Sequence, residues 1–103
     1  YEAKYSKIAV RFDTSDFDSL KTEKSYKILN ALLQGPKSKK ELLINTLELT
    51  SQIYNYQRYI EPLMARKLII QTIKDRPRSP KQKYAITSLG YYFLMYLTRL
   101  PIK

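Results

Sequence analysis

The amino-acid sequence predicts one α+β domain that is mainly α-helical and carries a single small β-hairpin. With 103 residues the chain has room for one compact domain, and a hydrophobic share of 44% is enough for a globular core. Apolar residues recur at helical spacing from residue 22 to about residue 65. Two β-branched stretches then flank a basic loop that contains Pro77 and Pro80, which is the pattern of a hairpin.

The first 20 residues are predicted to form an arm in front of a domain that covers residues 21–103. Ile8, Val10 and Phe12 recur at every second position, which indicates a short strand or an extended segment. Residues 13–16 are polar and predict a loop. The pattern leaves open whether the arm packs on its own domain, on a partner subunit or on neither. It is also a candidate contact for a further protein partner.

Two helices are predicted between residues 22 and 47. Leu29 and Leu33 recur on one face of the first, which begins near Thr22 and ends before Gly35 because glycine suits a helix C-terminus. The second begins with the residues Ser38-Lys39-Lys40-Glu41. This is a capping box, in which the Ser and Glu side chains satisfy backbone amides that the helix leaves unpaired.

After a break near Glu48, a third helix is predicted over about residues 51–65, capped by Thr50 or Ser51. The stripe predicted to face the core consists of Ile53, Tyr56, Ile60 and Leu63. Pro62 lies inside this pattern and has no backbone N–H, so we expect it to kink the helix or shift its end.

Strands are predicted at residues 68–73 and 84–86, with a basic loop between them. Thr87 or Ser88 then caps a last helix over about residues 88–99. The order is helix, helix, helix, strand, basic loop, strand, helix. It predicts a winged helix-turn-helix with three helices, a wing hairpin and a C-terminal dimerisation helix.

The residue types exclude several classes of function. The chain has no Cys and no His, which excludes disulfides, thiolate catalysis, Cys/His zinc sites and acid–base chemistry by His. Glu41, Glu48 and Glu61 lie on different predicted helix faces and form no catalytic or metal-binding set. We therefore expect no enzyme, no cofactor and no metal. No apolar run reaches the roughly 20 residues that a membrane span needs, so we expect no membrane partner.

The charge predicts a polyanionic partner. Lys and Arg number 19 against 9 Asp and Glu, which gives a net charge of +10. Such an excess on a short chain is typical of nucleic-acid-binding proteins. An anionic membrane surface and a charge that only keeps the protein soluble are the alternatives that composition leaves open.

Two segments carry a sequence pattern that is also found in known proteins. They are residues 59–69 (YIEPLMARKLI) and residues 84–90 (YAITSLG), the second followed by Phe93-Leu94. They resemble archaeal winged-helix DNA-binding proteins, whose pattern is Tyr-Leu, two residues, Leu, three residues, Gly-Leu-Ile, and later Tyr-x-Ile-Thr-x-x-Gly. The resemblance covers roughly residues 22–100. Lys67 stands where these proteins have Gly, so we expect a mildly strained left-handed turn there. The resemblance implies a dimeric DNA-binding regulator or a chromatin protein.

The predicted DNA-binding residues belong to three places. The outward face of the third helix would enter a major groove, where Arg pairs with guanine and Asn with adenine. The start of the second helix would hold a phosphate, and the hairpin tip would lie on the backbone or in a minor groove. At each place the alternative is a solvated polar face. The residues are Lys37, Ser38, Lys39 and Lys40; Ser51, Gln52, Tyr54, Asn55 and Arg58; and Lys74, Arg76, Arg78, Lys81 and Lys83.

The last predicted helix is apolar on nearly all sides, and a helix of this kind is usually buried on all sides. One small domain cannot cover both of its faces, so a second copy is predicted to cover one of them. The predicted interface residues are Tyr91, Leu94, Met95 and Thr98. The alternative is that Ile8, Val10 and Phe12 fold over this helix within one chain.

The sequence therefore predicts a homodimer that binds double-stranded DNA and regulates transcription. One alternative is a chromatin or plasmid-partition protein that coats DNA, and another is a winged-helix module for protein interaction. The expected location is cytoplasmic, on the nucleoid. A composition rich in Lys, Ile, Leu and Tyr suits a hot-environment archaeon or one of its plasmids or viruses.

Overall fold

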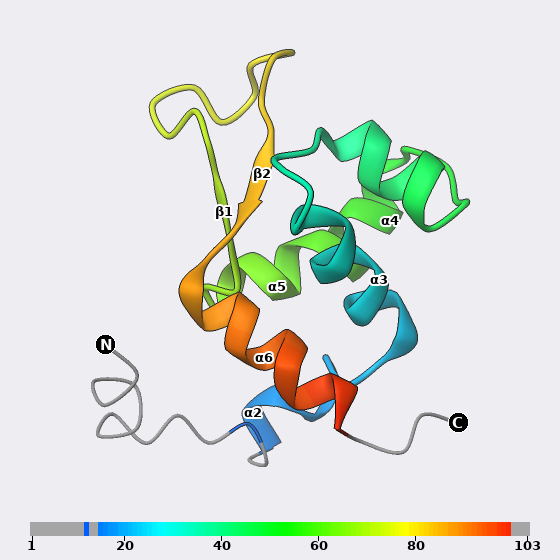
Figure 1. The fold of residues 1–103 in the computed structure, drawn as a ribbon. Coiled ribbons are helices and arrows are strands. Elements are labelled where there is room, and N and C mark those ends of the chain that lie inside the picture. Colours follow the sequence, from blue (N-terminus) through cyan, green and yellow to red (C-terminus); the bar gives the residue numbers. More distant parts are fainter. Residues whose placement is uncertain (1–11, 13–14, 100–103) are drawn as a thin grey trace.

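The computed structural model describes residue 12 and residues 15–99, in which helices pack beside one antiparallel two-stranded sheet (Figure 1). The helical segments are α2 (Ser15–Asp18), α3 (Glu23–Leu32), η1 (Glu41–Thr46), α4 (Ile53–Asn55), η2 (Tyr56–Ile60), α5 (Glu61–Ala65) and α6 (Ser88–Thr98), and the strands are β1 (Ile69–Gln71) and β2 (Tyr84–Ile86). The mainly helical α+β class and the predicted order of elements from α3 to α6 are confirmed. The predicted strand of the arm lies outside the described residues, and α2 begins at a position where a loop was predicted. The boundary between arm and domain at residue 20 stays a prediction.

The predicted starts of three helices follow from their caps. The Thr22 hydroxyl accepts a hydrogen bond from the Ser25 backbone N–H at 3.2 Å and caps α3. The capping box is confirmed, since Ser38 N donates to Glu41 Oε1 at 2.9 Å and Glu41 N donates to Ser38 Oγ at 3.1 Å. The backbone bond from Ser38 holds the pKa of Glu41 below its ordinary value. Thr87 caps α6 by accepting from Gly90 N at 2.9 Å.

The third predicted helix is one continuous helical stretch, α4–η2–α5, whose first turn faces differently from the prediction. Ile53 was expected in the core, yet 62% of it is exposed, whereas Ile60 and Leu63 are buried. The cause is the π-helical segment η2, in which the Glu61 N–H bonds back to Tyr56 O, five residues earlier. The extra residue rotates everything before it by about 100° relative to an unbroken α-helix. Pro62, which has no N–H to donate, follows at once.

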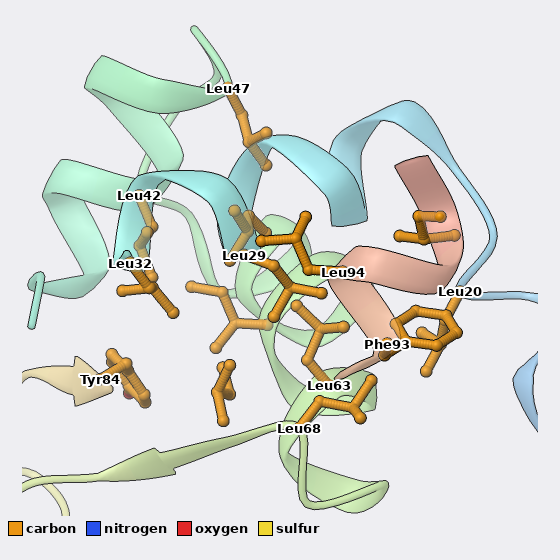
Figure 2. Close-up of a cluster of buried hydrophobic side chains, with 14 of the residues drawn as sticks. Leu20, Leu29, Leu32, Leu42, Leu47, Leu63, Leu68, Tyr84, Phe93 and Leu94 are labelled. Carbon is orange, nitrogen blue, oxygen red and sulfur yellow. The ribbon is translucent and has the colours of Figure 1, made fainter. Parts of the chain in front are cut away.

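The hydrophobic core lies where α3, η1, α5 and α6 meet above the sheet. Leu29, Leu42, Leu63, Leu68 and Phe93 are fully buried there and point toward one another (Figure 2). In the sheet, Ile69 pairs with Ile86 and Gln71 with Tyr84, so β1 is shorter than the predicted strand. The chain just before η1 joins the other edge of β2, because Lys37 N donates to Tyr84 O at 3.0 Å and Tyr84 N donates to Lys37 O at 2.7 Å.

Two turns place non-glycine residues in the left-handed region. Lys67 has a φ of 60° and Glu48 a φ of 58°. The strained turn that the sequence predicts at Lys67 is therefore confirmed, and the predicted break near Glu48 coincides with the second such turn. Both turns redirect the chain, the first into β1 and the second toward α4.

The end of the predicted arm covers part of α6 within the same chain. The Phe12 ring lies 5.1 Å from the Phe93 ring, 5.2 Å from the Phe17 ring and 5.5 Å from the Tyr96 ring. Phe12 is 8% exposed and Leu20 5%. The alternative in which the arm folds over the last helix therefore holds for Phe12, and the apolar surface of α6 no longer requires a second copy to cover it.

Candidate functional site

An exposed apolar and aromatic face lies on α4 and η2. Ile53 is 62% exposed and Tyr54 is 59% exposed, more than any other exposed large hydrophobic residue that the structure describes. Isolated exposed apolar side chains are ordinary, but Ile53 and Tyr54 are adjacent in sequence, and Tyr54 lies against a cation, Arg58, which suits a binding surface. The π-helical turn described above is what brings Ile53 to this surface instead of the core.

Arg58 orders the tyrosines on both sides of it. Its Nη1 donates a hydrogen bond to the Tyr54 hydroxyl. Its Cζ lies 5.8 Å from the centroid of the Tyr54 ring and 5.7 Å from that of the Tyr59 ring, which is cation–π geometry. The bond to the Tyr54 oxygen holds the pKa of Arg58 above its ordinary value. The cation is therefore held in place before any partner binds.

A groove of about 480 Å³ opens beside Arg58, between the start of α3 and the η2–α5 stretch. Lys24 of α3 lines it, and Lys24 Nζ lies 5.8 Å from the Tyr59 ring centroid. Tyr59 thus has one cation beside it from α3 and a second, Arg58, from its own helix. We name the set Lys24, Ile53, Tyr54, Arg58 and Tyr59 the cation–tyrosine face.

The other residues predicted on the third helix have different roles. The Asn55 side-chain amide donates to Thr50 O and to Thr50 Oγ1, both at 3.0 Å, so it closes the turn before α4 and is not free for a base edge. Gln52, not Thr50 or Ser51, occupies the N-cap position, and its side chain makes no capping bond. Ser51 is half-buried.

The lysines at the start of the second helix lie beside the hairpin. Lys37 pairs with Tyr84 through the backbone, and the charges of Lys37 and Lys83 both help to lower the pKa of Glu41. Lys39 Nζ lies 5.7 Å from the Tyr56 ring centroid. Lys40 is exposed, while Ser38 is committed to the capping box. The fold therefore brings Lys37 of the predicted helix start and Lys83 of the predicted hairpin tip close to the same carboxylate, Glu41.

Two tyrosines beside these lysines, Tyr56 and Tyr84, form a pair. The Tyr84 hydroxyl donates to the Tyr56 hydroxyl at 3.4 Å, and the ring centroids are 6.3 Å apart. Burial raises the pKa of the Tyr56 hydroxyl, and its interaction with the Tyr84 hydroxyl raises it further. Tyr84 is 4% exposed and belongs to the core, so this pair holds η2 against β2.

The hairpin loop presents basic side chains on a frame built by one glutamine. Its exposed basic residues are Lys74, Arg76, Arg78, Lys81 and Lys83. Gln82 is 7% exposed, and its side chain accepts from Ile73 N at 2.9 Å and donates to Ile73 O at 2.7 Å and Arg76 O at 3.1 Å. Sequence reasoning missed Gln82, because a Gln between two lysines in a loop gives no signal of burial.

The predicted interface residues of α6 do not share one surface. Leu94 is 1% exposed and belongs to the core of its own chain, whereas Tyr91 is 44% exposed. Met95 is half-buried, and the exposed Thr98 donates its hydroxyl proton to Met95 O at 2.6 Å. A homodimer through α6 stays a prediction. The reason given for it, that α6 needs a second copy to cover one of its apolar faces, no longer applies.

Metal ligands and membrane spans were also sought in residue 12 and residues 15–99. No group of three or more His, Cys, Asp or Glu residues in this part of the chain could hold a metal ion. No helix in the same part is long and apolar enough to cross a membrane.

The sequence matches the family described as "Filamentation induced by cAMP protein Fic-like, C-terminal domain" over residues 23–87. The chain belongs to this Fic-like C-terminal domain family. A solved structure of a Fic family protein from Desulfovibrio desulfuricans G20 is similar in fold, with a TM-score of 0.58 and 24% sequence identity. The similarity covers 84% of this chain and 24% of that protein, so the chain spans about a quarter of the Fic protein that it matches. A comparison with curated proteins found no match.

The family match corrects the identification made from sequence. The resemblance to archaeal winged-helix DNA-binding proteins is wrong, and so is the predicted function of a dimeric DNA-binding transcription regulator. The predicted location on the nucleoid has no support from these comparisons. The residues that carried the resemblance have structural reasons to be there. Thr87 caps α6, Gly90 allows α6 to approach the Leu68 backbone, and Lys67 makes a turn. Such residues report a helix-and-hairpin frame and carry no information about its partner.

Proposed function

We propose that this chain is a non-catalytic C-terminal module of a Fic-type protein, and that it binds a protein surface through the cation–tyrosine face. The observation that carries the proposal is the exposure of Ile53 and Tyr54 beside a cation that is already fixed. As the finer description of the fold we propose the winged helix, since three helical segments followed by a basic-tipped hairpin fit that arrangement.

The composition of this face supports a protein partner. Tyrosine and arginine are enriched among the residues that contribute most to protein–protein binding. Tyr54 and Arg58 are held by each other, so binding would cost little additional side-chain entropy, which runs to about 0.5 to 1.5 kcal/mol for each mobile side chain that an interface immobilises. A face of this kind, with tyrosines and cations held against one another, is favourable for recognition.

The partner that we propose is the portion of the same Fic-type protein that precedes this chain. The similar Fic family structure is about four times as long as the part that this chain matches, so most of that protein lies outside the similarity. A module joined to its partner in one chain binds at a high effective concentration, and a small ordered face is then sufficient.

The proposal predicts that the preceding portion, produced separately, binds this chain in trans and that binding depends on the face. Replacing Tyr54 and Arg58 together by alanine should raise the dissociation constant at least thirtyfold, because the loss of each side chain removes a contact at the centre of the interface. Isothermal titration calorimetry measures this directly. Tyr91→Ala, which removes an exposed tyrosine from α6, is the matched control and should leave binding unchanged. Equal affinity for all three proteins would contradict the proposal.

A further inference from the structure

The groove beside Arg58 has the chemistry to recognise an acidic side chain. Its two cations come from different elements, Lys24 from α3 and Arg58 from η2, and both lie against the same tyrosine ring, Tyr59. A carboxylate in the groove would be attracted by both charged groups, and a hydrogen bond from either would be charge-assisted, about twice as strong as a neutral one.

The rest of the lining sets limits on what can enter. Leu20 and Pro62 contribute apolar surface next to the cations, and a volume of about 480 Å³ suits a few side chains of an extended peptide. An apolar wall gives no contact to a bare phosphate but does favour an apolar residue next to an acidic one. The amino-terminal end of α3 adds no free backbone donor at Ser25, because the Thr22 hydroxyl already accepts from the Ser25 N–H.

One acidic residue also lines the groove, and its charge is partly offset. Glu23 Oε1 lies 4.0 Å from Lys27 Nζ, one helical turn along α3. The charges that face the groove are therefore Lys24 and Arg58 against Glu23, with Lys27 behind the glutamate. The balance is positive, which favours an anionic group while limiting the attraction for a polymer of closely spaced phosphates.

We propose that this groove binds a peptide segment that carries an Asp or Glu next to an apolar residue, with the carboxylate between Lys24 and Arg58. The inference rests on the proposed function, since it gives the chemistry of the segment that the same module binds. It assigns recognition of the acidic residue to the groove and recognition of the flanking apolar surface to Ile53 and Tyr54.

A random dodecapeptide library displayed on phage, selected against the protein, tests the proposal without presuming a sequence. We expect the recovered peptides to be enriched in Asp or Glu adjacent to an apolar residue. Fluorescence anisotropy of the tightest recovered peptide should then show binding about tenfold weaker for Lys24→Gln and for Arg58→Gln, the loss expected when one charged partner of a carboxylate is removed. Lys81→Gln removes the same charge from the exposed hairpin loop and should bind like the unaltered protein.

One variant of opposite sign and two competitors complete the experiment. Glu23→Gln should strengthen peptide binding, because it removes the acid that, among the residues the structure describes, lines the groove. Recovered peptides without acidic enrichment, or equal losses in Lys24→Gln and Lys81→Gln, would overturn the proposal. Displacement of the peptide by inorganic polyphosphate or duplex DNA at matched charge concentration would also overturn it, since the groove would then respond to charge alone.

Failure here can be told apart from failure of the proposed function. If the preceding portion of the Fic-type protein binds in trans and depends on Tyr54, but no acidic enrichment is found, the module stands and its groove takes another group. If acidic peptides bind but the preceding portion does not, the groove stands and the partner is a separate protein.

Discussion

Replacing Gly90 by alanine is expected to lower the free energy of unfolding by about 3 kcal/mol or more, the upper range for overpacking a tight interior. A Cβ at this position would lie 2.0 Å from the backbone oxygen of Leu68 and 2.9 Å from Cγ1 of Ile86. The Leu68 oxygen cannot move aside freely, because it also accepts hydrogen bonds from Thr87 N and Thr87 Oγ1, both at 3.0 Å. Helix α6 would therefore have to shift away from the sheet. Urea denaturation followed by circular dichroism measures the loss.

Gly35→Ala is the matched comparison for this prediction. No atom lies within 4 Å of a Cβ built at Gly35, so nothing has to move. Its φ of +136° is a conformation that side chains rarely adopt, and the expected loss is about 1 to 3 kcal/mol from backbone strain alone. If Gly90→Ala costs less than Gly35→Ala, the close approach of α6 to Leu68 is not as described.

Phe93→Ala is the second substitution with a large expected effect, a loss of about 3 to 5 kcal/mol. Phe93 has no exposed surface, and its ring lies 5.1 Å from that of Phe12, 5.6 Å from that of Phe17 and 6.2 Å from that of Tyr96. Truncation would leave a cavity at the point where the end of the arm meets α6. Thermal and urea unfolding of the variant give the change in stability.

A double-mutant cycle with Phe12→Ala adds a check on the packing of the arm. The double variant should lose about 0.5 to 1.5 kcal/mol less stability than the sum of the losses in the two single variants, the range for an aromatic pair beyond its buried area. Tyr91→Ala on the exposed side of α6 should change stability by no more than about 0.5 kcal/mol. Strict additivity of the Phe12 and Phe93 losses would mean that Phe12 does not pack on Phe93.

The parts of the fold that the sequence predicted well are those that local chemistry determines. A threonine or serine before a helix gave the caps at Thr22 and Thr87, and the spacing of Ser38 and Glu41 gave the capping box. The positive φ at Lys67 could be predicted only because a resembling pattern has glycine at that position.

The face of the third helix could not be predicted in the same way. A regular spacing of 3.6 residues puts Ile53 in the core, but the π-helical turn at η2 adds a residue and exposes it. Tertiary packing around Ile60 and Leu63 decides where that turn falls, and no single residue type signals it. Arg58 and Tyr54 were predicted from the sequence to face outward, as DNA-binding residues, whereas Lys24 and Tyr59 were not singled out because their meeting depends on how α3 crosses η2.

Hydroxyl-radical footprinting of Tyr54 and Ile53, read by mass spectrometry, tests whether the cation–tyrosine face is the binding surface. The oxidation rates of these residues would be compared between this chain alone and the intact Fic-type protein, with the exposed Tyr91 as internal reference. We predict that Tyr54 and Ile53 are oxidised several-fold more slowly in the intact protein, while the oxidation rate of Tyr91 does not change. Equal reactivity of Tyr54 and Ile53 in both forms would mean that nothing covers the cation–tyrosine face, and would contradict its role as the binding surface.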